Sequence, residues 1–116
     1  VLDVAVDIRK DSQTYGHYFS IILSEENKKM FWIHPGFAHG FLTLEDQTIF
    51  SYKCSGDYNP SSEGSLIWND PDLNIDWKVK KPIISDKDKK LIGSIRTCLL
   101  FLKRKHDVAK QIISFI

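Results

Sequence analysis

Residues 1–9 read VLDVAVDIR and alternate apolar and polar side chains from the first residue. Val4, Val6 and Ile8 fall on one face, and acidic residues alternate with them. A period of two is typical of a β-strand that buries one face. The stretch therefore predicts a strand. Because the alternation is already present at Val1 and the first residue is not methionine, we expect the chain to be a fragment or a truncated gene product of a larger fold.

Further short strands are predicted downstream, separated by polar turns. They are expected at 15–23, 30–33, 40–44 and 48–55, with 65–68 a weaker candidate. The first of these, YGHYFSIIL, is aromatic and β-branched, which is the composition that strands favour. Short strands at intervals of roughly 8–12 residues with turns between them indicate an antiparallel sandwich or barrel.

The sequence changes character after Pro82. Ser85 can cap a helix, with Asp88 at its third position. Apolar residues then recur at steps of three and four through residues 91–116, which predicts an amphipathic helix, or two with a break near His106. Packing of this helix on the sheet or on another chain is favoured over an anionic membrane surface. We expect a β-domain over residues 1–88 and a helical tail over 89–116.

Composition excludes several classes of protein. The chain has 116 residues, 42% hydrophobic and 27% charged, which is ordinary for one globular domain. The net charge of +1 combines a net of −7 over residues 1–77 with +8 over 78–116. Cys54 and Cys98 are not in a metal or redox spacing and indicate reduced thiols, hence a cytoplasmic protein. No apolar run is long enough to span a membrane, and no basic–aromatic strip suggests nucleic acid.

The segment WIHPGFAHGF, residues 32–41, concentrates aromatic rings, glycines and two histidines. Proline and glycine exclude a continuous helix, so a turn that leads into a strand is expected. His39 either lines a pocket or is a buried histidine bonded to a backbone carbonyl, and the residues alone leave both interpretations open. His34 is expected at the surface. No third ligand accompanies the two histidines, which argues against a metal site.

Several blocks together resemble the dTDP-4-dehydrorhamnose 3,5-epimerase family. The blocks are VLDVAVDIRKDSQTYG, WIHPGFAHGF, FSYKC, NPSSEG, WNDPD, IDW and PIISDKD, in order over residues 1–88. The resemblance implies a cupin-type jelly roll, incomplete here at its N-terminus, that forms a homodimer and uses no metal or cofactor. It also implies epimerisation of a dTDP-4-dehydro-6-deoxy-sugar at C3 and C5, by removal and return of protons beside a carbonyl.

The resemblance carries roles for five residues. Tyr52 matches the family's proton donor, and Asp88 matches the aspartate that orients the base histidine. His39 matches a histidine that hydrogen-bonds the substrate, and Tyr58 an aromatic near the thymine base. Lys87 faces either the diphosphate or solvent.

The family's base histidine belongs to a G-L-H-x-Q block that would precede residue 1. Two functions are therefore open. One is a dTDP-4-dehydrorhamnose 3,5-epimerase. The other is a catalytically inactive cupin-like module for nucleotide-sugar binding or assembly.

Overall fold

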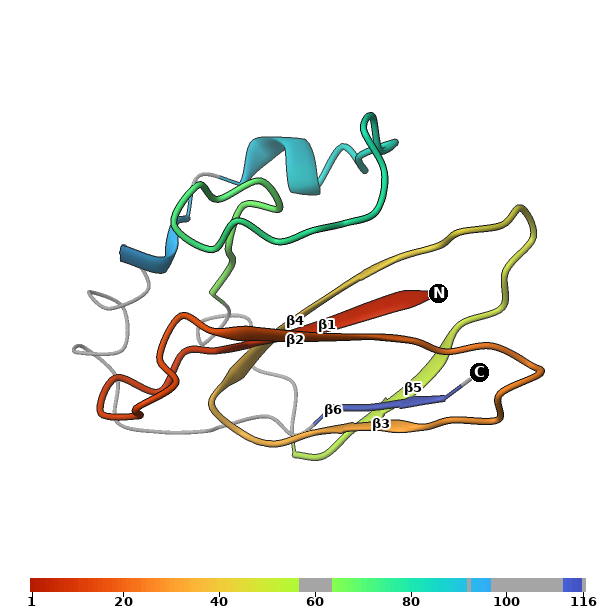
Figure 1. The fold of residues 1–116 in the computed structure, drawn as a ribbon, viewed down its shortest axis with the longest axis horizontal. Coiled ribbons are helices and arrows are strands. Elements are labelled where there is room, and N and C mark those ends of the chain that lie inside the picture. The colour runs from red at the N-terminus through yellow and green to blue at the C-terminus, as the bar shows by residue number, and fades with distance from the viewer. Residues whose placement is uncertain (57–63, 92, 97–111, 116) are drawn as a thin grey trace.

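The computed structural model describes residues 1–56, 64–91 and 93–96, together with the backbone of residues 112–115, as two antiparallel three-stranded sheets (Figure 1). The first sheet has the order β2-β1-β4 and the second the order β3-β6-β5. The strands of the first sheet are β1 (Leu2–Asp7), β2 (Tyr18–Ile22) and β4 (Phe37–Leu42). Those of the second are β3 (Phe31–Ile33), β5 (Ser51–Cys54) and β6 (Ile112–Phe115).

Strand β1 is the central strand of the first sheet, and all six of its residues are buried. It pairs antiparallel with β2, Val4 standing opposite Ser20, and with β4, where Ala5 stands opposite His39. A central strand is covered on both faces and satisfied along both edges, which explains why even its carboxylates are buried.

One face of β1 builds the hydrophobic core. Leu2, Val4 and Val6 form a buried cluster with Leu73 and Ile95. Residues 64–91 and 93–96, the covering segment, run over this face of the first sheet, on the side away from the second sheet (Figure 1). Full burial of such a side chain stabilises a fold by roughly 1.5–3 kcal/mol. The alternation in VLDVAVDIR therefore selects the face on which the core forms.

Hydrogen bonds hold the covering segment in place. The buried Asp70 carboxylate accepts from the backbone N–H groups of Asp72 at 2.8 Å and Ile95 at 2.8 Å. The Trp77 indole donates to the Trp68 carbonyl at 2.7 Å. These contacts join the two ends of the covering segment to one another, so that Leu73 and Ile95 reach the core together.

The predicted strands are confirmed as a mainly β, antiparallel fold, with boundaries that shift by a few residues. The largest shift is in the strand expected at 40–44, which begins at Phe37 and ends at Leu42. The weaker candidate at 65–68 is wrong, because no strand forms there in the described residues. Ile67 instead donates one backbone hydrogen bond to Gly93, at 2.7 Å.

The helical tail expected over residues 89–116 does not form at either of its described ends. Ser85 accepts from the Asp88 backbone N–H at 3.1 Å, as a cap does, but the element that follows is one 3₁₀ turn, Asp88–Lys90. Residues 97–111 lie outside the described part. At Ile112–Phe115 a strand replaces the expected helix, because this segment pairs with both β3 and β5. The division at residue 88 stays a prediction.

Within the described ranges, no helix is long and apolar enough to cross a bilayer.

Candidate functional site

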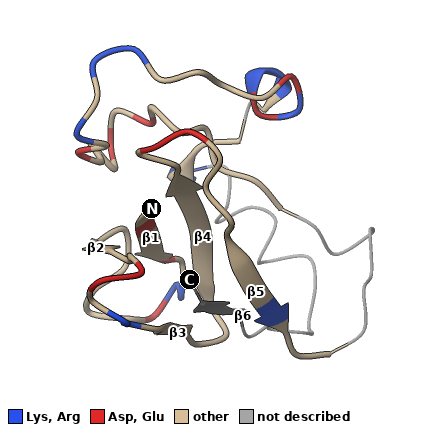
Figure 2. Cartoon of the chain, turned by 90° about the vertical axis from the view of Figure 1, so that its right-hand side faces the viewer, with Lys and Arg blue, Asp and Glu red and all other residues tan. Residues whose placement is uncertain are grey.

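The face of β1 opposite the core carries Asp3, Ala5 and Asp7. This face looks towards the second sheet (Figure 1). The register with β4 places Phe37, His39 and Phe41 along it, so the motif WIHPGFAHGF contributes three rings to the same surface. Figure 2 shows β1, with its acidic residues in red, beside β4, and β5 next to β4.

The central contact of this face joins Asp3 and His39. The Asp3 carboxylate is fully buried, and its Oδ1 contacts His39 Nε2, whose side chain is 9% exposed. The second oxygen, Oδ2, is buried without a hydrogen-bond partner among the described residues. A carboxylate on one ring nitrogen fixes the tautomer and orientation of an imidazole, which leaves Nδ1 for another partner.

Aromatic rings connect His39 to β5. The His39 ring centroid lies 6.2 Å from that of Phe41 and 6.4 Å from that of Phe50. Phe41 and Phe50 are 4.4 Å apart, and Phe50 lies 5.9 Å from Tyr52. Tyr52 is 54% exposed, so its phenol is accessible from solvent. The structure thus brings the predicted proton donor and the predicted substrate-binding histidine onto one aromatic surface.

A cavity of about 230 Å³ lies near the end of β1. Ala5, Phe19 and Phe37 line it, with His17 and Thr14 among its polar residues, whereas His39 and Tyr52 do not. Its volume is below the roughly 300–1,000 Å³ that is usual for ligand pockets.

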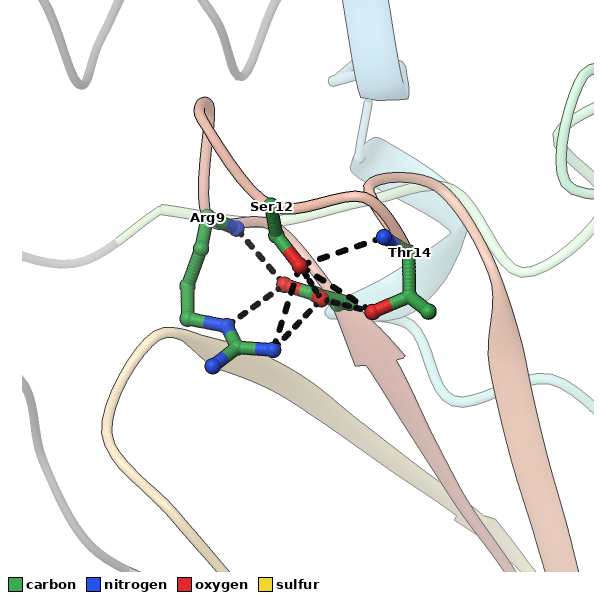
Figure 3. A network of polar contacts seen from close by, with 4 residues as sticks. Arg9, Ser12 and Thr14 are labelled. Carbon is green, nitrogen blue, oxygen red and sulfur yellow. Dashed lines mark hydrogen bonds and ion pairs between the residues drawn. The ribbon is translucent and has the colours of Figure 1, made fainter.

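A second buried carboxylate, Asp7, ends the strand. It accepts from Arg9 Nε at 2.9 Å and from the hydroxyls of Ser12 and Thr14, both at 2.6 Å (Figure 3). Hydrogen bonds from the Arg9 guanidinium hold the pKa of the Asp7 carboxyl far below its usual range, although burial alone would raise it. The loop after β1 is therefore anchored by a permanently charged pair.

The other predicted site residues lie elsewhere. Lys87 and Asp88 are exposed on the covering segment. This segment lies on the opposite side of the first sheet from the second sheet (Figure 1). The Asp88 carboxylate accepts from the Ser85 hydroxyl at 2.6 Å. Tyr58 lies outside the described residues. His34 is exposed, as expected, with its ring 6.5 Å from that of Trp32.

Sequence reasoning missed Asp3 as a site residue. Neither of the two interpretations left open for His39, a pocket residue or a buried histidine on a backbone carbonyl, named the Asp3 carboxylate that Nε2 contacts. The strand period places Asp3 on the face away from the apolar residues, so nothing in the sequence indicated that its carboxylate would be buried and need a partner. His39 lies 36 residues after Asp3 in the chain, so the two could not be paired without the register of β1 and β4.

The described residues contain no group of three or more His, Cys, Asp or Glu side chains arranged to hold a metal ion. What they do contain is a carboxylate-bound histidine and an accessible phenol, joined by aromatic contacts. Both can exchange protons with a bound molecule. Fold and site together define an antiparallel β-protein with groups suited to acid–base chemistry.

Comparison with known proteins identifies the family. The sequence model of dTDP-4-dehydrorhamnose 3,5-epimerase matches residues 1–93. Proteins of that name are 49% identical over 88 residues in Shigella flexneri, 52% over 89 in Salmonella typhimurium and 48% over 92 in Methanothermobacter thermautotrophicus. These matches cover 76%, 76% and 77% of this chain, and 49%, 49% and 50% of those proteins. The chain belongs to the dTDP-4-dehydrorhamnose 3,5-epimerase family, and it spans about half the length of these relatives.

Proposed function

We propose that this chain takes part in the 3,5-epimerisation of a dTDP-4-dehydro-6-deoxy-sugar, with Tyr52 as proton donor and the Asp3–His39 pair as its polar partner. The reaction follows from the name that the relatives carry. C3 and C5 both flank the carbonyl carbon C4, so their C–H bonds are weakly acidic and a proton can be exchanged at each. Inversion then requires removal from one face and return to the other.

The single observation that carries the proposal is the aromatic connection between Tyr52 and His39 through Phe50. A phenol returns a proton to carbon when it lies against the face of the sugar ring. A histidine that donates its Nε2–H to Asp3 presents Nδ1 as an acceptor, which can take a hydrogen bond from a hydroxyl of the sugar. The rings between them offer an apolar surface for the pyranose.

The family resemblance supports further parts of the same proposal. We infer a cupin-type jelly roll as the complete architecture and a homodimer as its assembly. Tyr58 would contact the thymine base and Lys87 the diphosphate. Asp88 would orient a base histidine supplied from outside residues 1–116.

Solvent isotope exchange tests the proposal. The purified chain is incubated with dTDP-4-dehydro-6-deoxy-glucose in D₂O, and deuterium at C3 and C5 is followed. Because the proposal takes its base histidine from outside residues 1–116, imidazole is added as the base. We expect incorporation above the rate with imidazole alone, and a loss of roughly 10²–10⁴-fold in Tyr52→Phe, as for removal of a general acid. Tyr18→Phe is the matched control, because the Tyr18 hydroxyl accepts from the Asp76 backbone at 3.2 Å, and this variant should exchange like the unmodified chain.

Two outcomes would contradict the assignment. Equal loss in Tyr18→Phe and Tyr52→Phe would show that neither phenol is specific to the reaction. Binding of the nucleotide sugar by the folded chain without any exchange would support the alternative, a catalytically inactive cupin-like module.

A further inference from the structure

The side chain of Arg9 interlocks with the turn that begins β4. Gly36 has a φ of +87°, and a Cβ placed on it would lie 2.5 Å from Cγ of Arg9. The aliphatic part of Arg9 therefore occupies the space that a side chain at position 36 would need. The Arg9 guanidinium carbon lies 4.7 Å from the ring centroid of Phe37, within the range of a cation–π contact. Backbone N–H of Ile8 also donates to the Gly36 carbonyl at 3.0 Å.

Arg9 is itself fixed to the end of β1. Its backbone N–H donates to Asp7 Oδ1 at 2.9 Å, and its terminal NH₂ group donates to Oδ2 at 2.7 Å. Figure 3 shows the guanidinium folded back against the carboxylate, with Ser12 and Thr14 on the other side. Asp7 is 1% exposed and is the last residue of β1, so Arg9 is tied to a buried end of a sheet strand.

The interlock lies two residues before His39. Asp7 stands opposite Phe37 in the register, Ala5 opposite His39 and Asp3 opposite Phe41. The His39–Asp3 contact is thus a diagonal one, which depends on β4 keeping this register. A slip of one residue would turn His39 to the opposite face of the sheet. In the described sheet β4 is an edge strand, so its register is set from the β1 side.

We propose that Arg9 is a positioning residue for His39: by holding Gly36 and Phe37, it fixes the start of β4 so that His39 Nε2 meets Asp3. The use of the free Nδ1 by a sugar hydroxyl rests on the proposed function. The positioning itself does not, because it can be measured on the protein without substrate.

Nuclear magnetic resonance of the full 116-residue chain, labelled with ¹⁵N in its imidazoles, tests this role. In the unmodified protein we expect one His39 tautomer, protonated at Nε2, with slow exchange of that proton. Arg9→Ala should speed this exchange at least tenfold and mix the two tautomers. Arg96→Ala is the matched control, since Arg96 is an exposed arginine that pairs with Asp72 at 2.7 Å, and it should leave the His39 signals unchanged.

Further variants separate positioning from a loss of folding. Gly36→Ala pushes against the Arg9 stem and leaves the charge on Asp7 in place, so it should produce the same His39 change. Arg9→Lys, which keeps the charge without the planar group over Phe37, should give an intermediate change. Backbone amide shifts of Leu2 and Leu73 report whether each variant keeps its core.

Unchanged His39 signals in a folded Arg9→Ala or Gly36→Ala protein would overturn the proposal, and so would an equal change in Arg96→Ala. The same variants are assayed for deuterium exchange at C3 and C5. A chain without exchange activity whose His39 signals depend on Arg9 would refute the proposed function and keep the positioning role. An active chain whose His39 signals are unchanged in Arg9→Ala would keep the proposed function and refute the positioning role.

Discussion

Removing His39 should destabilise the protein far more than removing the whole Asp3–His39 pair. In His39→Leu the Asp3 carboxylate, 0% exposed, loses the partner of Oδ1, while Oδ2 already has none in the described residues. Removing the hydrogen-bond partner of a buried carboxylate leaves an uncompensated charge and costs about 3–5 kcal/mol. Asp3→Val leaves an imidazole whose side chain is 9% exposed, and a buried polar group without its hydrogen bond costs roughly 1–3 kcal/mol.

The double variant Asp3→Val/His39→Leu leaves neither group behind. Apolar residues that replace a buried pair are often neutral or stabilising. We therefore expect the double variant to be more stable than His39→Leu by at least about 2 kcal/mol, although simple addition of the two single costs predicts the opposite order.

Urea unfolding followed by tryptophan fluorescence measures the cycle. With a slope of about 1–3 kcal/mol per molar urea, His39→Leu should lower the midpoint by 1 M or more. Additive single costs, or a cost below about 1 kcal/mol for His39→Leu, would refute the view that the two residues form one buried hydrogen-bonded unit.

Two further predictions concern the other buried carboxylates. Arg9 is the chief cause of the lowered pKa of Asp7, so the stability that the Asp7 carboxylate contributes is complete above the ordinary pKa of 3.8 and is lost as the pH falls below that value. Acid unfolding of the unmodified chain should show this loss of stability, and Asp7→Asn should show a shallower dependence on pH. Equal slopes in the two proteins would contradict the prediction. Asp70→Ala should cost roughly 3 kcal/mol or more in urea unfolding, because it leaves buried N–H groups of Leu73 and Ile95 without their acceptor. Asp70→Asn retains one acceptor oxygen and should cost less, and a reversed order would show that the charge matters more than the hydrogen bonds.

The sequence predicts the strands well because their signal is local. The alternation in residues 1–9 and the turn chemistry of residues 32–41 depend only on near neighbours. The same alternation also fixes which face of β1 packs against the core, before any partner is known. It places Asp3 on the other face, and the burial of that face depends on the second sheet. The pairing of Asp3 with His39 requires the register of β1 and β4, which two other strands separate in the chain.

The C-terminal segment shows where local signals mislead. Steps of three and four between apolar residues predict a helix at 112–115, yet Ile112 and Ile113 are β-branched and equally suited to a strand. The structure places them between β3 and β5, where both backbone edges are paired. Asp88 is a related case: its carboxylate accepts from Ser85, but the helix that the two were expected to cap does not form there, and the 3₁₀ turn begins after Lys87 without a side-chain cap. Its role beside a base histidine stays a prediction.

The order in which the chain is synthesised has a consequence for the core. All three strands of the first sheet have been made once Leu42 is added, but Leu73 and Ile95, which cover Leu2, Val4 and Val6, come later. At about 5–20 residues per second, the 53 residues from 42 to 95 take about 3–10 s to translate. During that interval the apolar face of a nascent sheet is open to the surroundings of the ribosome. We expect chaperones that bind exposed apolar strands to have access to this face during those seconds, before the covering segment packs on it.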